Sequence, residues 1–230
     1  MKTIGLIGGM SWESSAKYYQ IINTVIKEKL GGLHSAKCLL YSVDFHEIEE
    51  CQSTGNWEKS ADMLGSIAVK LEKAGADFIV ICTNTMHKVA DEISEVISIP
   101  LLHIAEATAQ ELKASGIKRV ALLGTKYTME QDFYKSRLSA NGMVVVIPES
   151  DDRIIINDII YNELCLGIIS EKSKSAFLTI LDNQANQGVQ AAILGCTEIG
   201  LLIQQEDTPM PLFDTAEIHA RKAALFSINT

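Results

Sequence analysis

The feature that most constrains the fold of this 230-residue chain is an internal repeat. Three apolar segments of the first half return in the second half in the same order: 3–9 with 119–125, 74–85 with 187–198, and 100–108 with 211–219. The paired segments lie 116, 113 and 111 residues apart, so their spacing is nearly constant. Such self-similarity indicates that one structural unit occurs twice. We therefore predict two similar halves related by a pseudo-twofold axis.

Each half has the pattern of an α/β unit. The segment 3–9 is apolar on both faces and ends in glycine, which is typical of a buried parallel strand. Behind it, Tyr18, Ile22 and Val25 lie on one helical face, and another buried strand is expected at 78–82. The expected fold class is α/β, with two similar domains that each contain a parallel sheet.

The order of the repeated segments also predicts the domain boundaries. We expect residues 1–98 plus 208–230 to form the first α/β domain and residues 99–207 to form the second. Ligands of open α/β sheets bind beyond the carboxyl ends of the strands. Two facing domains would therefore share one active site, in the cleft between their strand ends.

The second repeated pair contains the candidate catalytic residues. Its alignment without gaps pairs Cys82 with Gly195 and Thr83 with Cys196. Successive side chains of a strand point to opposite faces, so Thr83 and Cys196 should both face the site while Cys82 turns into the sheet. We predict that Cys82 is a small buried side chain and that the other two residues face the substrate.

A helix is expected to begin directly after each of these strands, in the segments 83–85 and 197–203. Thr or Asn side chains would then act as N-caps, and free backbone N–H groups with the helix dipole would bind a carboxylate. The same field would lower the pKa of the Cys196 thiol from about 8.5 toward neutrality and make it a usable base and acid. We therefore predict a site for a small carboxylate, with a thiol on one side and a hydroxyl on the other.

Composition argues against several kinds of partner. A net charge of −9 disfavours binding to nucleic acid or to an anionic membrane. No apolar run approaches the ~20 residues of a membrane span, and the start of the chain is too brief for a signal peptide. The five cysteines are scattered and lack CxxC spacing, which suits a reduced cytoplasmic protein. His, Asp and Glu show no metal-ligand spacing, so no metal is expected.

Four short motifs resemble those of the cofactor-independent aspartate/glutamate racemase superfamily: GGM at 8–10, TNTMH at 83–87, LLGT at 122–125 and GCTE at 195–198. The resemblance covers essentially the whole chain. It implies two α/β domains, an amino acid as small-molecule substrate, and no pyridoxal phosphate or other cofactor. In that superfamily two cysteines on opposite faces of the substrate exchange its α-proton. Its members are commonly dimers, so a homodimer is expected here.

The resemblance assigns residue roles and exposes a departure from the family pattern. Cys196 matches the second catalytic thiol, but Thr83 stands where the first cysteine should be. An alcohol is a weaker acid than a thiol by roughly 7 pKa units. We therefore expect efficient proton removal from one face only, with Thr83 acting through a water or as a donor toward the carbanion. The residues implied to contact the substrate are Met10, Gln52, Asn84, Thr85 and Thr197.

The residues around the substrate side chain also depart from the pattern. Gln52 and Cys165 stand where acidic-substrate members carry an arginine and a lysine that hold the side-chain carboxylate. A neutral pocket would hold a carboxylate less tightly and tolerate uncharged side chains better. We expect either weak activity on aspartate and glutamate or a broader choice of amino acids.

Two other functions remain open. A single-thiol decarboxylase of the arylmalonate type, from the same superfamily, would need only Cys196. A non-catalytic amino-acid-binding protein would need neither proton donor nor acceptor. We also expect Glu198 to fix its loop by accepting hydrogen bonds rather than to titrate during turnover. His87 is expected either to orient the Thr83 region or simply to cap and pack.

Overall fold

The computed structural model describes residues 1–229, which form two compact units. Among these residues, unit 1 comprises 1–104 and 219–229, and unit 2 comprises Ala105–Ile218. The chain therefore changes unit within two helices rather than in the loops before them. The domain boundaries expected from the sequence, 1–98 plus 208–230 and 99–207, stay a prediction.

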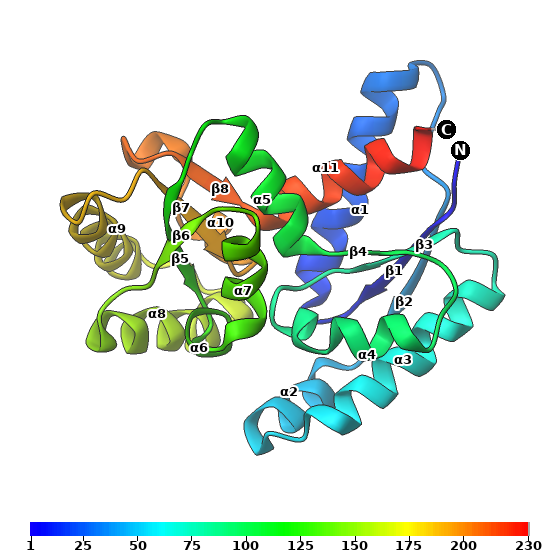
Figure 1. Cartoon of the computed structure of the whole chain (residues 1–230), viewed down its shortest axis with the longest axis horizontal. Helices are drawn as coiled ribbons and strands as arrows, with labels where there is room; N and C mark the ends of the chain where they lie inside the picture. Colours follow the sequence, from blue (N-terminus) through cyan, green and yellow to red (C-terminus); the bar gives the residue numbers. More distant parts are fainter. Residues whose placement is uncertain (230) are drawn as a thin grey trace. The chain divides into compact units, whose positions relative to one another are not determined.

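The sheet of unit 1 has four parallel strands in the order β2-β1-β3-β4 (Figure 1). Their bounds are β1 Ile4–Gly8, β2 Cys38–Ser42, β3 Phe78–Ile81 and β4 Leu101–Leu102. The two central strands, β1 and β3, are buried along their whole length because helices cover both of their faces.

The sheet of unit 2 repeats this arrangement, with four parallel strands in the order β6-β5-β7-β8. Their bounds are β5 Arg119–Gly124, β6 Val144–Val146, β7 Ala191–Gly195 and β8 Leu212–Asp214. The α/β class with two four-stranded parallel sheets is confirmed.

Register matches between the two sheets as well as strand order. Ile7 pairs with Ile81 in unit 1, and Leu123 pairs with Leu194 in unit 2. These are the same residue pairs that the sequence repeat aligns. The repeated segments therefore hold equivalent places in two copies of one topology.

The longer helices begin at side-chain caps where the sequence offers them. In unit 1 the helices are α1 Trp12–Leu30, α2 Phe45–Thr54, α3 Trp57–Lys73, the 3-10 helix η1 Thr85–Val89 and α4 Ala90–Glu95. Ser11, Asp44 and Asn56 accept hydrogen bonds from backbone N–H groups in the first turns of α1, α2 and α3. Such caps satisfy donors that a helix leaves unpaired, and so they fix where each helix starts.

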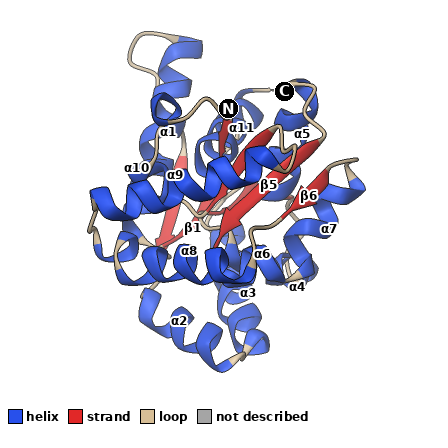
Figure 2. Cartoon of the chain, turned by 90° about the vertical axis from the view of Figure 1, so that its left-hand side faces the viewer, coloured by secondary structure: helices blue, strands red, loops and turns tan. Residues whose placement is uncertain are grey.

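Most helices of the second half belong to unit 2 (Figure 2). They are α5 Ile104–Ala114, α6 Lys126–Glu130, α7 Asp132–Ala140, α8 Ser150–Asn162, η2 Leu164–Leu166, α9 Glu171–Asn186, α10 Ile199–Leu202 and η3 Gln205–Asp207. The last helix, α11 Thr215–Ile228, belongs to unit 1 from His219 onward, where Phe226 packs against Phe78 of β3. Ile156 from α8 and Phe177 from α9 join one apolar cluster with Leu123 and Leu194 of the sheet. Burial of such side chains contributes on the order of 2 kcal/mol each. This cluster holds the end of β7 in place.

None of the helices within residues 1–229 has the length and apolar character needed to cross a membrane.

Candidate active site

The carboxyl end of β3 carries the first candidate residue. Cys82 is fully buried, whereas the next residue, Thr83, is half-buried. The backbone at Cys82 is tied on both sides: its N–H donates to the carbonyl of Ile7, and its carbonyl accepts from Ser14 Oγ at 3.0 Å. Burial raises the pKa of the Cys82 thiol far above its ordinary range. The prediction that Cys82 is a buried side chain is confirmed.

His87 holds the carbonyl of Thr83 in a fixed position. Its Nδ1 lies 2.7 Å from the Thr83 carbonyl oxygen, and its Nε2 lies 3.2 Å from the backbone nitrogen of Ile104. A carbonyl can only accept and a backbone N–H can only donate, so these contacts place the ring proton on Nδ1. The neutral ring is therefore engaged through both nitrogens. It orients the Thr83 segment, which is one of the two roles expected for it.

The other predicted residues of unit 1 lie near the same strand end. Met10 is buried in the apolar cluster that also contains Met86. Gln52, buried on α2, directs its Nε2 at the Met86 sulfur, 3.1 Å away. Asn84 and Thr85 are also buried, at the start of η1.

The carboxyl end of β7 carries the second candidate. Cys196 is 8% exposed, and its Sγ donates to Oε2 of Glu198 at 3.0 Å. The Thr197 hydroxyl donates to the same oxygen at 2.6 Å. Thr197 and Glu198 are themselves buried. One carboxylate therefore accepts hydrogen bonds from both residues that the sequence singled out at this strand end.

The prediction that the Cys196 thiol has a lowered pKa is wrong. Burial raises its pKa well above the usual range, and the negative charge of Glu198 and the nearby Cys165 add to the effect. Two negative groups in contact away from water repel one another, so the thiol keeps its proton. The sulfur is therefore a protonated donor in this arrangement.

The expected side-chain N-caps are not formed at either strand end, within the part of the chain that the structure describes. Asn84 precedes the five-residue η1 and Glu198 precedes the four-residue α10, and neither makes a side-chain cap hydrogen bond. Peptide dipoles add up only along a regular helix, so the four-residue α10 supplies little field at Cys196. It therefore does not offset the burial and the neighbouring charges that raise the pKa of the thiol.

Two glycines let β5 and β7 approach closely beside Cys196. A Cβ on Gly195 would lie 2.8 Å from the carbonyl oxygen of Leu123, and one on Gly124 would lie 2.8 Å from that of Gly195. Real side chains do not tolerate this distance to backbone atoms. The glycine before the thiol is therefore required by packing.

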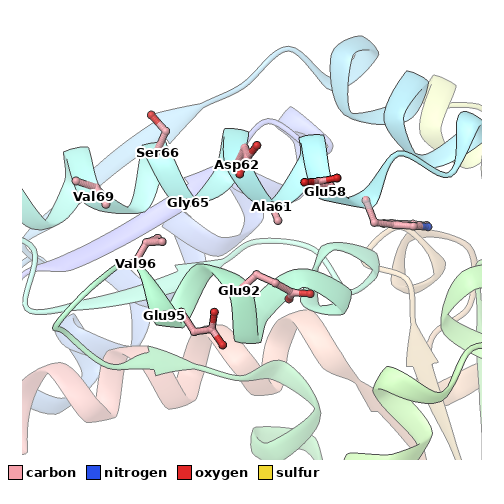
Figure 3. Close-up of a pocket in the computed structure, with 10 residues that line it drawn as sticks. Glu58, Ala61, Asp62, Gly65, Ser66, Val69, Glu92, Glu95 and Val96 are labelled. Atoms are coloured by element: carbon pink, nitrogen blue, oxygen red, sulfur yellow. The ribbon is translucent and has the colours of Figure 1, made fainter.

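A separate hollow of about 590 Å³ lies between α3 and α4 in unit 1 (Figure 3). Its lining includes Glu58, Asp62, Glu92 and Glu95, with apolar side chains such as Val96 between them. It contains none of the predicted site residues. Four carboxylates would repel the carboxylate of an amino acid, so this hollow is not the candidate site.

No group of three or more His, Cys, Asp or Glu side chains among residues 1–229 is arranged to hold a metal ion.

Comparison with known proteins decides the family. The sequence model of the Asp/Glu/Hydantoin racemases matches residues 7–223. The chain belongs to the Asp/Glu/Hydantoin racemase family. This confirms the resemblance seen in the four motifs.

Racemases and their homologues with solved structures share the whole fold. A crystal structure from Yersinia pestis, whose protein carries a provisional Asp/Glu racemase name, is 54% identical, covers 100% of both chains and has a TM-score of 0.94. An aspartate racemase homologue from Pyrococcus horikoshii is 36% identical over 100% of both chains, with a TM-score of 0.87.

The broad specificity amino-acid racemase RacX of Bacillus subtilis is 29% identical over 67% of this chain. That match spans 66% of RacX, just under two thirds of its length.

Glu198 makes one contact that the sequence did not predict. It was expected to fix its loop, and it does accept a hydroxyl hydrogen bond from Thr197. Its contact with the Cys196 sulfur was not foreseen. The signal was present in the GCTE motif, since a residue two positions after the thiol can turn back when no long helix follows.

Proposed function

We propose that this chain is a cofactor-independent amino-acid racemase in which Cys196 and the Thr83 side chain act on opposite faces of one amino acid. The observation that carries the proposal is a thiol at the end of β7 in hydrogen-bond contact with a carboxylate, on a chain of the racemase family. Thr83 holds the equivalent position after β3. A thiol and a neighbouring proton acceptor are what exchange of an α-proton needs.

The two faces are expected to differ in chemistry. A hydroxyl at Thr83 is a poor base, so Cys196 should remove the α-proton of one enantiomer, while the Thr83 side delivers or relays a proton. Two enantiomers have equal free energy, so kcat/KM must be equal in the two directions. The asymmetry should instead appear as exchange with retention: one enantiomer exchanges its α-proton with solvent at Cys196 faster than it inverts.

The proposed substrates are amino acids with small or uncharged side chains, with aspartate and glutamate as weaker substrates. Met10, Gln52, Asn84, Thr85 and Thr197 are proposed to contact the substrate. In support, Gln52 carries no charge, and its Nε2 already donates a hydrogen bond to the Met86 sulfur. Cys165 lies close enough to Cys196 to act on its pKa, and it supplies no positive charge for a side-chain carboxylate. The name of RacX, a broad specificity racemase, agrees with such a range.

Incubation of L- and D-amino acids in D₂O, followed by proton NMR and chiral chromatography, tests the function. Wild type should exchange the α-proton and form the opposite enantiomer, and Cys196→Ser should lose at least ~100-fold of both activities because the acid–base group is gone. Thr179→Ser, on the exposed side of α9, serves as a matched control. Amino acids that bind without any exchange would contradict the proposal and favour a binding protein.

A second candidate is a single-thiol decarboxylase, because the protonated Cys196 is a ready acid for an enediolate. It predicts release of carbon dioxide from substituted malonates and no α-proton exchange on amino acids. The same D₂O experiment, with a malonate added, separates the two functions.

We further propose that the protein works in the cytoplasm as a homodimer. All five cysteines, including the half-buried Cys38 and Cys165, are free thiols, which fits a reducing compartment. Light scattering on the purified protein should give twice the 25.2 kDa of the chain; the mass of a monomer would contradict the dimer.

A further inference from the structure

The contact between Cys196 and Glu198 makes it costly for the Cys196 thiol to become the thiolate that a catalytic base requires. The thiol is 8% exposed and shares Oε2 of Glu198 with the Thr197 hydroxyl. Loss of its proton to solvent would leave a thiolate 3.0 Å from a carboxylate, both away from water. Like charges in such a contact cannot both ionise at low cost, so the pair holds one proton between them.

The charged and titratable groups that act on Cys196 add to this repulsion. The groups that act on the charge of Cys196 are Glu198, on the turn that leads into α10, and Cys165, on η2. Burial and the charges of both groups raise the pKa of the thiol, and only a weaker hydrogen bond from the backbone of Glu198 acts in the opposite direction. The pair carries one negative charge whether the proton lies on Sγ or on Oε2. The positive ammonium group of an incoming substrate, if it lies nearer to Sγ, favours the arrangement with a thiolate and a protonated carboxyl.

We propose that Glu198 is the proton acceptor of Cys196: when substrate binds, the proton moves from Sγ to Oε2, and the resulting thiolate removes the α-proton. The proposal rests on the racemase function above. In the first step S–H and COO⁻ become S⁻ and COOH. In the second, S⁻ takes the α-proton and becomes S–H while the α-carbon becomes a carbanion. The Thr83 side then protonates the carbanion and regains its proton from solvent, and Glu198 releases its proton to solvent, so no proton is consumed overall.

Glu198→Gln tests this role because an amide keeps the size of the side chain but cannot take a proton. Without the carboxylate charge, the Cys196 pKa should fall, so alkylation of Cys196 by iodoacetamide near neutral pH should become several-fold faster. Peptide mass spectrometry assigns the alkylation to this cysteine among the five. In the same variant, α-proton exchange should fall at least ~100-fold, since the acceptor is lost. Faster alkylation together with slower exchange is the expected signature.

Two further variants complete the test: a control at another carboxylate, and a variant that keeps a carboxylate at position 198. Glu163→Gln is the matched control, since this carboxylate accepts from Ser173 Oγ at 2.6 Å in the same unit and should leave the alkylation profile of Cys196 unchanged. Glu198→Asp retains a carboxylate on a shorter stem, so it should recover part of the exchange and an alkylation profile between wild type and the amide. It also serves as the test variant if Glu198→Gln does not fold.

Each outcome decides the proposal. Slower alkylation together with slower exchange would show that Glu198 only holds the loop, and unchanged exchange would show that it takes no proton; both overturn the proposal. A wild type without any exchange on amino acids would overturn the racemase function and this role with it. In that case, an unchanged alkylation rate in Glu198→Gln would also show that the carboxylate does not act on the Cys196 thiol. Faster alkylation would show that the two groups interact, but without a role in racemisation.

Discussion

The hydroxyl of Tyr18 lies 2.9 Å from Nδ1 of His219, although 201 residues separate them in the sequence. His219 Nε2 lies 2.8 Å from the carbonyl oxygen of Leu102, so Nε2 carries the ring proton and Nδ1 accepts from the tyrosine. The sequence repeat places Tyr134 at the position of Tyr18 and Thr108 at that of His219. Those two hydroxyls lie 3.5 Å apart in unit 2. The two contacts thus join α1 to α11, which follows β8, and α7 to α5, which follows β4.

Tyr18→Phe should destabilise the protein more than Tyr134→Phe. The first change leaves the buried Nδ1 of His219 without this donor, which typically costs ~1–3 kcal/mol. The second removes a contact at the limit of hydrogen-bond length, so its cost should be below ~1 kcal/mol. Urea denaturation midpoints of the two variants measure the difference, and equal losses would contradict the ranking.

His219 should make stability fall in mild acid. Burial lowers its pKa from 6.5 to about 4, so the unfolded chain binds the proton more readily than the folded one. This part of the stability is present above about pH 6.5 and is lost as the pH falls toward 4, on the order of 3 kcal/mol in total.

His219→Gln removes the titrating group and should flatten this part of the profile. Denaturation midpoints of wild type and variant are compared between about pH 7.5 and 4, a range that spans both pKa values of His219. The difference between the two profiles isolates the contribution of His219 from that of the carboxylates. Parallel profiles for the two proteins would show that the buried imidazole is not the cause.

Gly195→Ala should reduce both stability and activity. The new methyl group would lie 2.8 Å from the carbonyl oxygen of Leu123, and overpacking of this kind costs ~1–3 kcal/mol. The strain falls directly before Cys196, so α-proton exchange should fall more than the loss of folded protein explains. Thermal melting and exchange rates measured on the same preparation check this.

Gly65→Ala is the control for that substitution. Gly65 lies in the middle of α3, where its Cβ would meet only a methyl group of the exposed Val96, at 3.1 Å. Alanine is a better helix former than glycine by up to ~1 kcal/mol, so this change should be neutral or stabilising and should not affect exchange. A similar loss in both variants would argue against a special close approach at Gly195.

Thr83→Cys should increase inversion relative to exchange with retention. A free thiol has a pKa of about 8.5, whereas an alcohol is closer to water at about 15.7, so the second face gains a more usable acid and base. The ratio of enantiomer formed to deuterium incorporated, followed in D₂O by chiral chromatography and NMR, should rise at least ~10-fold. Thr83→Val, which keeps the shape without the hydroxyl, should lower the same ratio; a rise there would contradict the role of Thr83.

Local periodicity carried enough information for the fold class and for the burial of Cys82. Strands such as Ile4–Gly8 and Ala191–Gly195 are short apolar runs that end in glycine, and their repetition in order predicted two matching sheets. The alternation of side chains along a strand also predicted that Cys82 is buried and that Thr83 is the more exposed neighbour. Such inferences succeed because they depend on residues close together in the chain.

The protonation state of Cys196 was decided by tertiary structure. The sequence suggested a helix after the thiol and therefore a lowered pKa, but α10 is four residues long and Glu198 turns its carboxylate onto the sulfur. The sequence by itself determined which side chains end the central strands. Desolvation, close contact of like charges and the tautomer of His219 arise from groups brought together only by folding, and so only the packed structure could decide them.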